Sequence, residues 1–270
     1  PITWEEAINI VAGELRRVID EHGNSSIYAG SYGWASAGRF HHAQSQIHRF
    51  LNCLGGYTKS VNTYSYAAAE VILPHVIGVN AAKIMTQQTS WSSIVSNAKL
   101  MVSFGGFPTG NSQISNGGVS DHIQVNYLRQ ASSKGISLIS IAPRQSTVDK
   151  TEQIEWIKAR PNSDTALILG ICHTLLKESL HNINFLKKFT VGYEKFFQYL
   201  TGQSDGVVKN AVWAEQLSGV SSYEISLLAR KMATTPTMLS ITWSLTRQEN
   251  GEQAYWAVIA LAAMLGQMGK

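Results

Sequence analysis

The hydrophobic residues at the start of the chain recur every three or four positions, the spacing of one helix face. Thr3 followed by Glu6 is a capping box, so an amphipathic helix is predicted from there to Gly23. The spacing of apolar residues after Gly23 predicts three further elements, and residues 57–65 form a polar stretch without a regular pattern. The predicted elements are a short strand at 25–31, a helix at 37–54 and a helix at 67–78.

From residue 99 the pattern changes to short apolar runs that alternate with helical spacing. Strands are predicted at 99–105, 136–143, 154–161 and 237–244, and helices at 119–135, 162–179, 251–269 and, as several short pieces, within 183–234. Strands that alternate with helices of this kind are typical of a parallel α/β sheet. Ligands bind such sheets at the carboxyl ends of the strands, so the loops after the strands are the expected site.

Composition adds limits on the class of protein. The 270 residues are 44% hydrophobic and 15% charged, which is typical of one large or two modest globular domains. The net charge is +4 with scattered basic residues, which favours a solvated surface over a nucleic-acid site. No apolar run approaches the ~20 residues of a membrane span. Because the chain starts at Pro1 and stops at Lys270, directly after a predicted helix, we expect a piece of a longer protein.

Two loops contain candidate binding residues. The loop FGGFPTGN, residues 104–111, follows a strand, and its glycines would let backbone N–H groups approach a phosphate. It is not GxGxxG, and an ordinary turn is the simpler interpretation. Pro161-Asn162-Ser163-Asp164 opens a helix, where Ser163 or Asp164 is expected to be the N-cap. The Asp164 carboxylate could also accept hydrogen bonds from the N1–H and N2–H₂ edge of a guanine.

The remaining polar candidates are weaker on their own. Cys53 and Cys172 are expected to be buried free thiols, and His41, His42 and His48 do not have the spacing of a metal site. Ser65 precedes the helix at 67–78, where an N-cap is the simplest role and a metal-bound alkoxide a rare one.

The order of motifs along the chain narrows these alternatives. The segments SYGW, GRFHHAQ, GGYT, YS, AAAEVILPHVIG, QQTSW, RPNSDTALILGICHTLL and GEQAYWAVIALAAMLGQMG resemble those of the molybdopterin S- and N-oxide reductases. This family contains the dimethyl sulfoxide, trimethylamine N-oxide and biotin sulfoxide reductases. The sequence of these segments most resembles the biotin sulfoxide reductase branch. The resemblance implies parts of two Rossmann-like α/β domains of the dimethyl sulfoxide reductase fold. Residues 1–89 would belong to the domain with the molybdenum ligand and 90–270 to the cofactor-binding domain.

Site residues follow from the same resemblance, position by position. Ser65 would bind molybdenum through Oγ, beside four dithiolene sulfurs of two molybdopterin guanine dinucleotides. Trp34 would lie against the oxo group, and Tyr32 would donate a hydrogen bond to it or to the incoming oxide. These three are the expected catalytic residues. The other expected cofactor contacts are Ser90 and Trp91 at a pterin, Gly105, Gly106, Pro108, Asn111, Pro143 and Arg144 at phosphates and ribose, Asp164 at a guanine, and Trp243 and Ser244 after the last strand.

Three positions depart from the family pattern. Ala142-Pro143 stands where Asp-Pro is common, Gly110 where a basic residue is frequent, and Thr246-Arg247 where Gln-Arg is usual. These departures affect individual cofactor contacts more than the molybdenum site. No iron–sulfur cluster can be built from Cys53 and Cys172, and the resemblance implies none for this group.

The resemblance therefore predicts reduction of S-oxides (biotin, methionine or dimethyl sulfoxide) or N-oxides by oxygen-atom transfer to molybdenum. Expected partners are the small oxide and an electron-donor protein or reduced nicotinamide, with no nucleic acid. The cytoplasm is the favoured compartment. The periplasm is the alternative if a twin-arginine leader preceded Pro1 and was lost with the N-terminus. Three alternatives are open. A formate or nitrate enzyme would use selenocysteine, cysteine or aspartate as metal ligand, so Ser65 disfavours it. A NAD dehydrogenase is disfavoured because the chain has no GxGxxG motif, and the third alternative is a non-catalytic fragment. The piece alone is not expected to bind the cofactor tightly or to be active.

Overall fold

A computed structural model describes the whole chain except residues 32, 37, 39, 115–117, 119 and 270 and the side chain of residue 147. It contains two compact units. The first consists of Pro1–Asn62 and Gly110–His122, and the second of Thr63–Thr109 and Ile123–Lys270.

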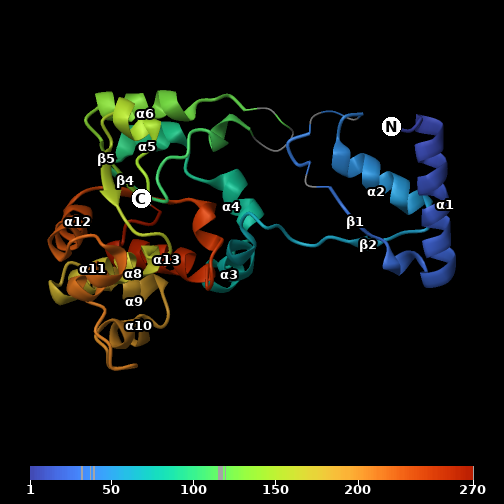
Figure 1. Ribbon diagram of the computed structural model, residues 1–270. Helices are drawn as coiled ribbons and strands as arrows, with labels where there is room; N and C mark the ends of the chain where they lie inside the picture. The colour runs from blue at the N-terminus through green and yellow to red at the C-terminus, as the bar shows by residue number, and fades with distance from the viewer. Residues whose placement is uncertain (32, 37, 39, 115–117, 119, 270) are drawn as a thin grey trace. The chain divides into compact units, whose positions relative to one another are not determined.

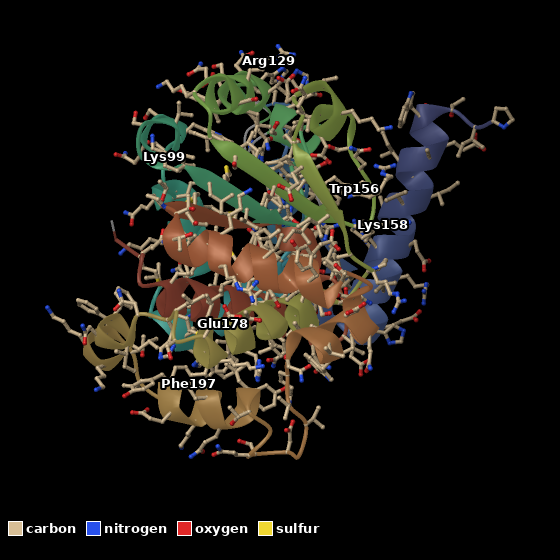
Figure 2. The ribbon with its side chains drawn as sticks, turned by 90° about the vertical axis from the view of Figure 1, so that its left-hand side faces the viewer. Lys99, Arg129, Trp156, Lys158, Glu178 and Phe197 are labelled. Carbon is tan, nitrogen blue, oxygen red and sulfur yellow. The ribbon has the colours of Figure 1, made fainter. Side chains whose placement is uncertain are left out.

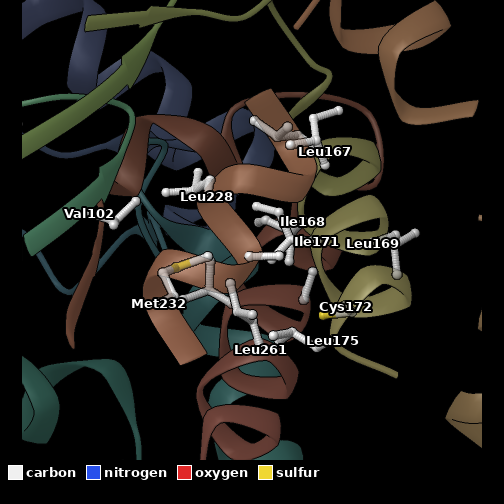
Figure 3. Packing of buried hydrophobic residues seen from close by; sticks show 14 of the residues in the cluster. Val102, Leu167, Ile168, Leu169, Ile171, Cys172, Leu175, Leu228, Met232 and Leu261 are labelled. Atoms are coloured by element: carbon white, nitrogen blue, oxygen red, sulfur yellow. The ribbon is translucent and has the colours of Figure 1, made fainter. Parts of the chain in front are cut away.

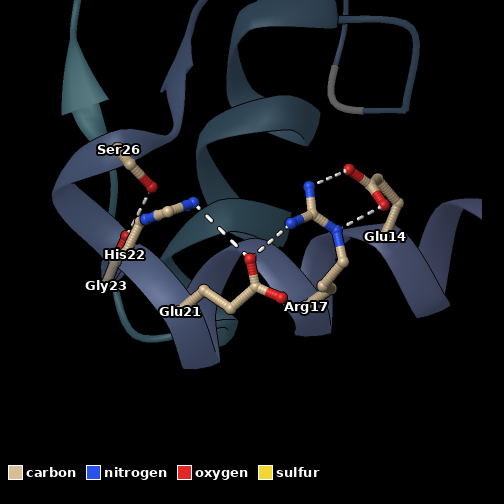
Figure 4. A network of polar contacts seen from close by, with 6 residues as sticks. All are labelled: Glu14, Arg17, Glu21, His22, Gly23 and Ser26. Carbon is tan, nitrogen blue, oxygen red and sulfur yellow. Dashed lines mark hydrogen bonds and ion pairs between the residues drawn. The ribbon is translucent and has the colours of Figure 1, made fainter.

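The first unit is built on the long helix α1 and a pair of very short strands. Its elements are α1 (Trp4–His22), η1 (Asn24–Ser26), β1 (Tyr28–Ala29), α2 (Ala43–Cys53), β2 (Thr58–Lys59) and η2 (Asn111–Gln113). Strands β1 and β2 pair in parallel. The predicted capping box is confirmed, because the Thr3 side chain accepts the Glu6 N–H and the Glu6 side chain accepts the Thr3 N–H. On the solvent face of α1, Arg17 bridges Glu14 and Glu21 (Figure 4).

Helix α2 is shorter than predicted. Among the described residues it begins at Ala43 rather than near residue 37. The cause is local: Gly38 has φ 74°, and the His42 ring accepts the Ser45 N–H as N-cap at 3.2 Å. The predicted strand at 25–31 shrinks to β1, because residues 24–26 form the turn η1. Cys53 is exposed at the end of α2, so its predicted burial is wrong, whereas Cys172 is buried as expected.

The second unit contains a four-stranded sheet with the order β5-β4-β3-β6, every pair parallel. The predicted parallel α/β sheet is therefore confirmed. Its elements are α3 (Ala67–Ile77), α4 (Ala81–Gln87), α5 (Trp91–Asn97), β3 (Leu100–Phe104), α6 (Gln124–Ser133), β4 (Ser137–Ala142), α7 (Thr147–Thr151), β5 (Glu155–Lys158), α8 (Asp164–Lys177), α9 (Ile183–Phe189), α10 (Tyr193–Leu200), α11 (Ala211–Ser218), α12 (Ser222–Thr234), β6 (Thr237–Ile241), η3 (Trp243–Thr246) and α13 (Glu252–Leu265).

Helices cover both faces of this sheet (Figure 1). Leu100, Val102 and Phe104 of β3 pack on one face, into a cluster with α8, α12 and α13. Met101 packs on the other face, with residues of α5, α6 and α7. Successive side chains of a strand point to opposite faces, so a strand buried on both faces is apolar along most of its length, as β3 is except at Ser103.

The predicted division at residue 89 does not coincide with the compact units. Residues 63–89 belong to the same unit as the sheet. Ala69 and Leu73 of α3 pack with Tyr255 and Ile259 of α13, which explains the association. The predicted boundary separates two domains of a longer protein, which the compact units of this chain do not test. That division therefore stays a prediction. No single helix in the described chain is long and apolar enough to cross a membrane; only α3 and α4 taken together, with a bend of 84°, pass by length and composition.

Helix α8 is the centre of the larger core (Figure 3). Leu167, Ile168 and Ile171 on it are fully buried. Gly170 lies where α11 crosses closely, and a Cβ built there would be 2.6 Å from the Ala214 Cβ. The absence of a side chain at this position therefore lets the two helices approach.

Two glycines in helix interiors offer a matched test of this packing. A Cβ at Gly13 in α1 would meet no atom within 4 Å, so Gly13→Ala should stabilise α1 by up to about 1 kcal/mol through helix propensity. Gly170→Ala makes the same change but overpacks α8 against α11, and we expect a net loss of about 1 kcal/mol. Hydrogen exchange of peptides covering the two helices measures both effects. Equal gains in the two variants would contradict close packing at Gly170.

Candidate functional site

The loops expected to bind the cofactor in the second unit lie at one edge of the sheet. All four strands are parallel, so their carboxyl ends meet there. Gly105 and Gly106 follow β3, Pro143 and Arg144 follow β4, Asp164 begins the helix after β5, and Trp243 and Ser244 follow β6. The structure thus brings together residues that are up to 139 positions apart, the interval between Gly105 and Ser244 (244 − 105).

The turn at Gly105 and Gly106 requires glycine for steric reasons. Both residues have positive φ, 91° and 76°. A Cβ at Gly105 would lie 1.9 Å from the Thr242 Oγ1, so only glycine lets the chain after β6 come this close. The Gly105 N–H donates to the Ile141 carbonyl at 2.8 Å, and the Gly106 N–H to the Ser103 carbonyl at 3.3 Å. Both N–H groups therefore have partners within the fold, and phosphate contact at this turn, as at the exposed Pro108, stays a prediction.

The turn after β4 is stabilised by hydrogen bonds to Asp149, a residue that the sequence analysis missed. Pro143 and Arg144 are exposed. Asp149 of α7 is 1% exposed, and its Oδ2 accepts the Ser146 N–H at 2.8 Å and the Ser140 hydroxyl at 3.2 Å. The spacing of Ser146 and Asp149 is a capping box, a signal that the sequence contained. Asp149 Oδ1 is buried and has no hydrogen-bond partner in the described part of the chain.

Strand β5 also supports this turn. Trp156 lies on β5, the strand beside β4 (Figure 2). Its Nε1–H donates to the Ala142 carbonyl at 2.9 Å. The carbonyl at the very end of β4 is thus held by a side chain of the neighbouring strand. This contact restrains the backbone at Ala142, the position where the resemblance implies an aspartate.

Asp164 is a buried carboxyl at the amino end of α8. The residue is only 5% exposed, and no ion pair among the described residues includes it. Burial raises the pKa of Asp164 to about 6. Ser163 occupies the N-cap position without a side-chain cap bond, because its hydroxyl donates to the Arg160 carbonyl at 2.7 Å. Ser163 is therefore the N-cap residue, as predicted, but its side chain does not cap the helix, and the Asp164 carboxyl begins α8.

Ser65 lies beside the residues that follow β6. It is half-buried and precedes Tyr66, which is the N-cap of α3, so the simple N-cap interpretation of Ser65 is wrong. The Tyr66 ring stacks on Trp243 with centroids 4.9 Å apart and planes at 6°. The Thr246 Oγ1 lies 3.4 Å from the Ser65 carbonyl oxygen. These contacts bring the expected metal ligand to the edge of the sheet.

Ser90 and Trp91 have structural contacts in the fold. The Ser90 hydroxyl oxygen accepts the Ser93 N–H at 3.3 Å and so caps α5. The Trp91 ring stacks on Tyr127 of α6, with centroids 5.8 Å apart. Their contact with a pterin stays a prediction.

The other expected site residues belong to the first unit. Trp34 is 37% exposed in a loop that Gln44 supports by donating to the Ser31 carbonyl at 3.0 Å. Asn111 is exposed at the start of η2. Tyr32 lies outside the described residues.

A metal at this site would depend on few protein atoms. No group of three or more His, Cys, Asp or Glu side chains in the described chain could hold a metal ion. The Ser65 hydroxyl is a hard oxygen donor of the kind that suits a high-valent metal, and further ligands would have to come from a cofactor.

A substitution at Gly105 tests the close approach of β3 and β6. We expect Gly105→Ala to lower the melting temperature measured by circular dichroism, because the new Cβ collides with Thr242 and the φ of 91° is strained. Gly110→Ala is the control, since Gly110 has no neighbour within 4 Å and no positive φ. Equal melting temperatures for the two variants would show that the turn adapts freely.

Asp164→Asn tests the buried carboxyl. The folded pKa of about 6 lies above the ordinary 3.8, so the folded protein binds a proton more readily than the unfolded chain between these values. The carboxyl therefore costs stability increasingly as the pH rises through this window. We expect Asp164→Asn to be more stable at pH 8, by about 3 kcal/mol, and to lose this advantage below pH 3.8.

Melting curves across this pH range measure the effect. The control is Asp20→Asn, a change at an exposed position of α1, for which no such pH-dependent gain is expected. A gain for Asp164→Asn that is the same at every pH would contradict a penalty from the buried charge.

Comparison with known proteins agrees with this arrangement. The chain matches the molybdopterin oxidoreductase family over residues 1–270. It is 40% identical to the biotin sulfoxide reductase of Cereibacter sphaeroides over 100% of its own length and 36% of that protein. It is 39% identical to the trimethylamine-N-oxide reductase of Haemophilus influenzae over 99% of its own length and 32% of that protein. The chain thus spans about a third of these relatives.

Among solved structures, acetylene hydratase from Pelobacter acetylenicus is similar with a TM-score of 0.67. The similarity covers 99% of this chain and 33% of that chain at 22% identity, and it concerns the fold alone. The predicted α/β class is confirmed by this likeness and by the parallel sheet. From the match along its entire length, the chain belongs to the molybdopterin oxidoreductase family.

Proposed function

We propose that the protein to which this chain belongs reduces S-oxides or N-oxides with a molybdenum cofactor. The observation that carries the proposal is the position of Ser65, whose turn is packed against Trp243 and Thr246 at the ligand-binding edge of the sheet. Relatives named biotin sulfoxide and trimethylamine-N-oxide reductases at about 40% identity support the substrate class. A serine oxygen at this position disfavours the formate and nitrate enzymes, and the glycine turn without GxGxxG disfavours a NAD dehydrogenase.

The residues present fit the guanine dinucleotide form of the cofactor. Asp164 is a buried carboxyl that pairs with no cation among the described residues, so the N1–H and N2–H₂ groups of a guanine would add donors to those it has within the fold. The exposed Arg144 after β4 would face a phosphate. Ser65 would supply one hard oxygen ligand.

Each part of the chain then has a distinct task. When bound, the cofactor supplies the two-electron chemistry of oxygen-atom transfer. Ser65 would hold the metal, and by the roles that the family resemblance implies, Trp34 would form an apolar wall that excludes water and the Tyr32 hydroxyl would donate to the oxide oxygen. Biotin sulfoxide or methionine sulfoxide is the favoured substrate. We propose an electron-donor protein or reduced nicotinamide as the reductant, and the cytoplasm as the compartment unless a twin-arginine leader is present.

The proposal is tested on the full-length parent protein produced with molybdate in a host that makes the cofactor. We expect about one molybdenum per chain by elemental mass spectrometry, and turnover of sulfoxides with a reduced viologen dye. Ser65→Ala should lower turnover more than about 100-fold, because even changes around a metal ligand cost 10- to 100-fold. The control is Ser60→Ala at an exposed serine.

The two possible failures have different meanings. A wild-type protein without molybdenum would remove the proposed function altogether. A Ser65→Ala variant with the wild-type rate would remove only the assignment of Ser65 as ligand.

A further inference from the structure

The peptide unit between Ser65 and Tyr66 is held from both of its sides by the segment that follows β6. On one side, the Tyr66 ring lies flat on the Trp243 ring, 4.9 Å between centroids and 6° between planes. On the other, the Thr246 Oγ1 lies 3.4 Å from the carbonyl oxygen of Ser65. Because a peptide unit is planar, contacts at its carbonyl oxygen and at the next side chain together restrict its orientation.

Thr246 is itself firmly held. It is 7% exposed, and its hydroxyl donates to the Trp243 carbonyl oxygen at 2.7 Å, so its 3.4 Å approach to the Ser65 carbonyl oxygen is the weaker of the two contacts. A Cβ at Gly251 would lie 2.0 Å from the Thr246 carbonyl oxygen, so the start of α13 closes directly over this residue. The 243–246 turn is therefore a rigid support rather than a loose loop.

Packing of α3 on α13 adds a second attachment. Ala69 and Leu73 are buried, with Tyr66, Tyr255 and Ile259 packed against them. The helix that follows Ser65 and the turn that contacts its carbonyl are thus both joined to α13. Movement of Ser65 relative to the residues after β6 would have to disrupt an aromatic stack and a buried cluster.

We propose that Tyr66 and Thr246 are positioning residues that set the location of the Ser65 oxygen. The inference rests on the proposed function, in which this oxygen binds molybdenum. A serine oxygen is one bond from Cβ, so a shift of the Ser65 backbone is passed almost fully to Oγ. Reactive groups must be held within about 0.5 Å of their productive place.

The test uses four variants of the full-length parent loaded with molybdenum. Tyr66→Leu removes the stack, and Tyr66→Phe keeps the ring. Thr246→Val removes the hydroxyl, and Thr246→Ser keeps it. For each we would measure the melting temperature, the molybdenum content, the electron paramagnetic resonance spectrum of the metal, and kcat and KM for one sulfoxide.

We expect the g values of the metal signal to change in Tyr66→Leu and Thr246→Val and to stay wild-type in Tyr66→Phe and Thr246→Ser. In the first pair kcat should fall about 10- to 100-fold, the scale of a misplacement of about 1 Å, while KM changes little. Loss of molybdenum at an unchanged melting temperature, restored by the conservative variant, would support the inference equally.

Wild-type spectra and kcat values within twofold of wild type in Tyr66→Leu and Thr246→Val would overturn it. Losses of kcat or of molybdenum that occur only in proportion to a lower melting temperature would overturn it as well, because they would indicate a general structural role. A failure of the proposed function is distinguishable from both results, since the wild-type protein itself would then contain no molybdenum.

Discussion

The parallel pairing of β3 with strands on both sides is the constraint on which the candidate site depends. Phe104, the last residue of β3, pairs with Ile141 on one side and Ile241 on the other. The three strands therefore end within one residue of the same level, and the chain segments that leave them must share a small space. Gly105 is the residue that makes this possible, because any side chain would occupy the place of the Thr242 hydroxyl. Loss of that close approach would separate the turn after β3 from the one that supports Ser65.

Much of this arrangement could be predicted from sequence. The buried strands β3 and β4 are mainly apolar runs, and the capping box at Thr3 and the long helix α8 have clear local signals. The resemblance indicated which loops matter. Local signals failed where a contact distant in sequence decides the outcome. Ser65 has the residue type of an N-cap, but the backbone at Tyr66 begins the helix, with its ring held by Trp243.

Three further features, the start of α2, the burial of Asp149 and the use of the glycine N–H groups after β3, could not be predicted from the sequence pattern either. The start of α2 depends on the positive φ of Gly38 and on a histidine cap, which is uncommon. Asp149 was visible as part of a capping box, yet only the structure shows that it lies 1% exposed beneath the turn after β4. The glycines after β3 were expected to offer N–H groups, whereas the structure uses those groups for its own backbone.

Buried carboxyls at the same edge of the sheet suggest how stability and binding are related. Asp164 is buried with a raised pKa, and Asp149 has one oxygen with no partner in the described chain. A fold selected for stability alone would replace such groups with apolar or amide side chains. Asp164 begins α8 at the edge where the strands end, and under the proposed function a ligand's donors would offset the cost of its burial. Asp149 instead holds Ser146 and Ser140, so its cost is tied to the shape of the turn after β4.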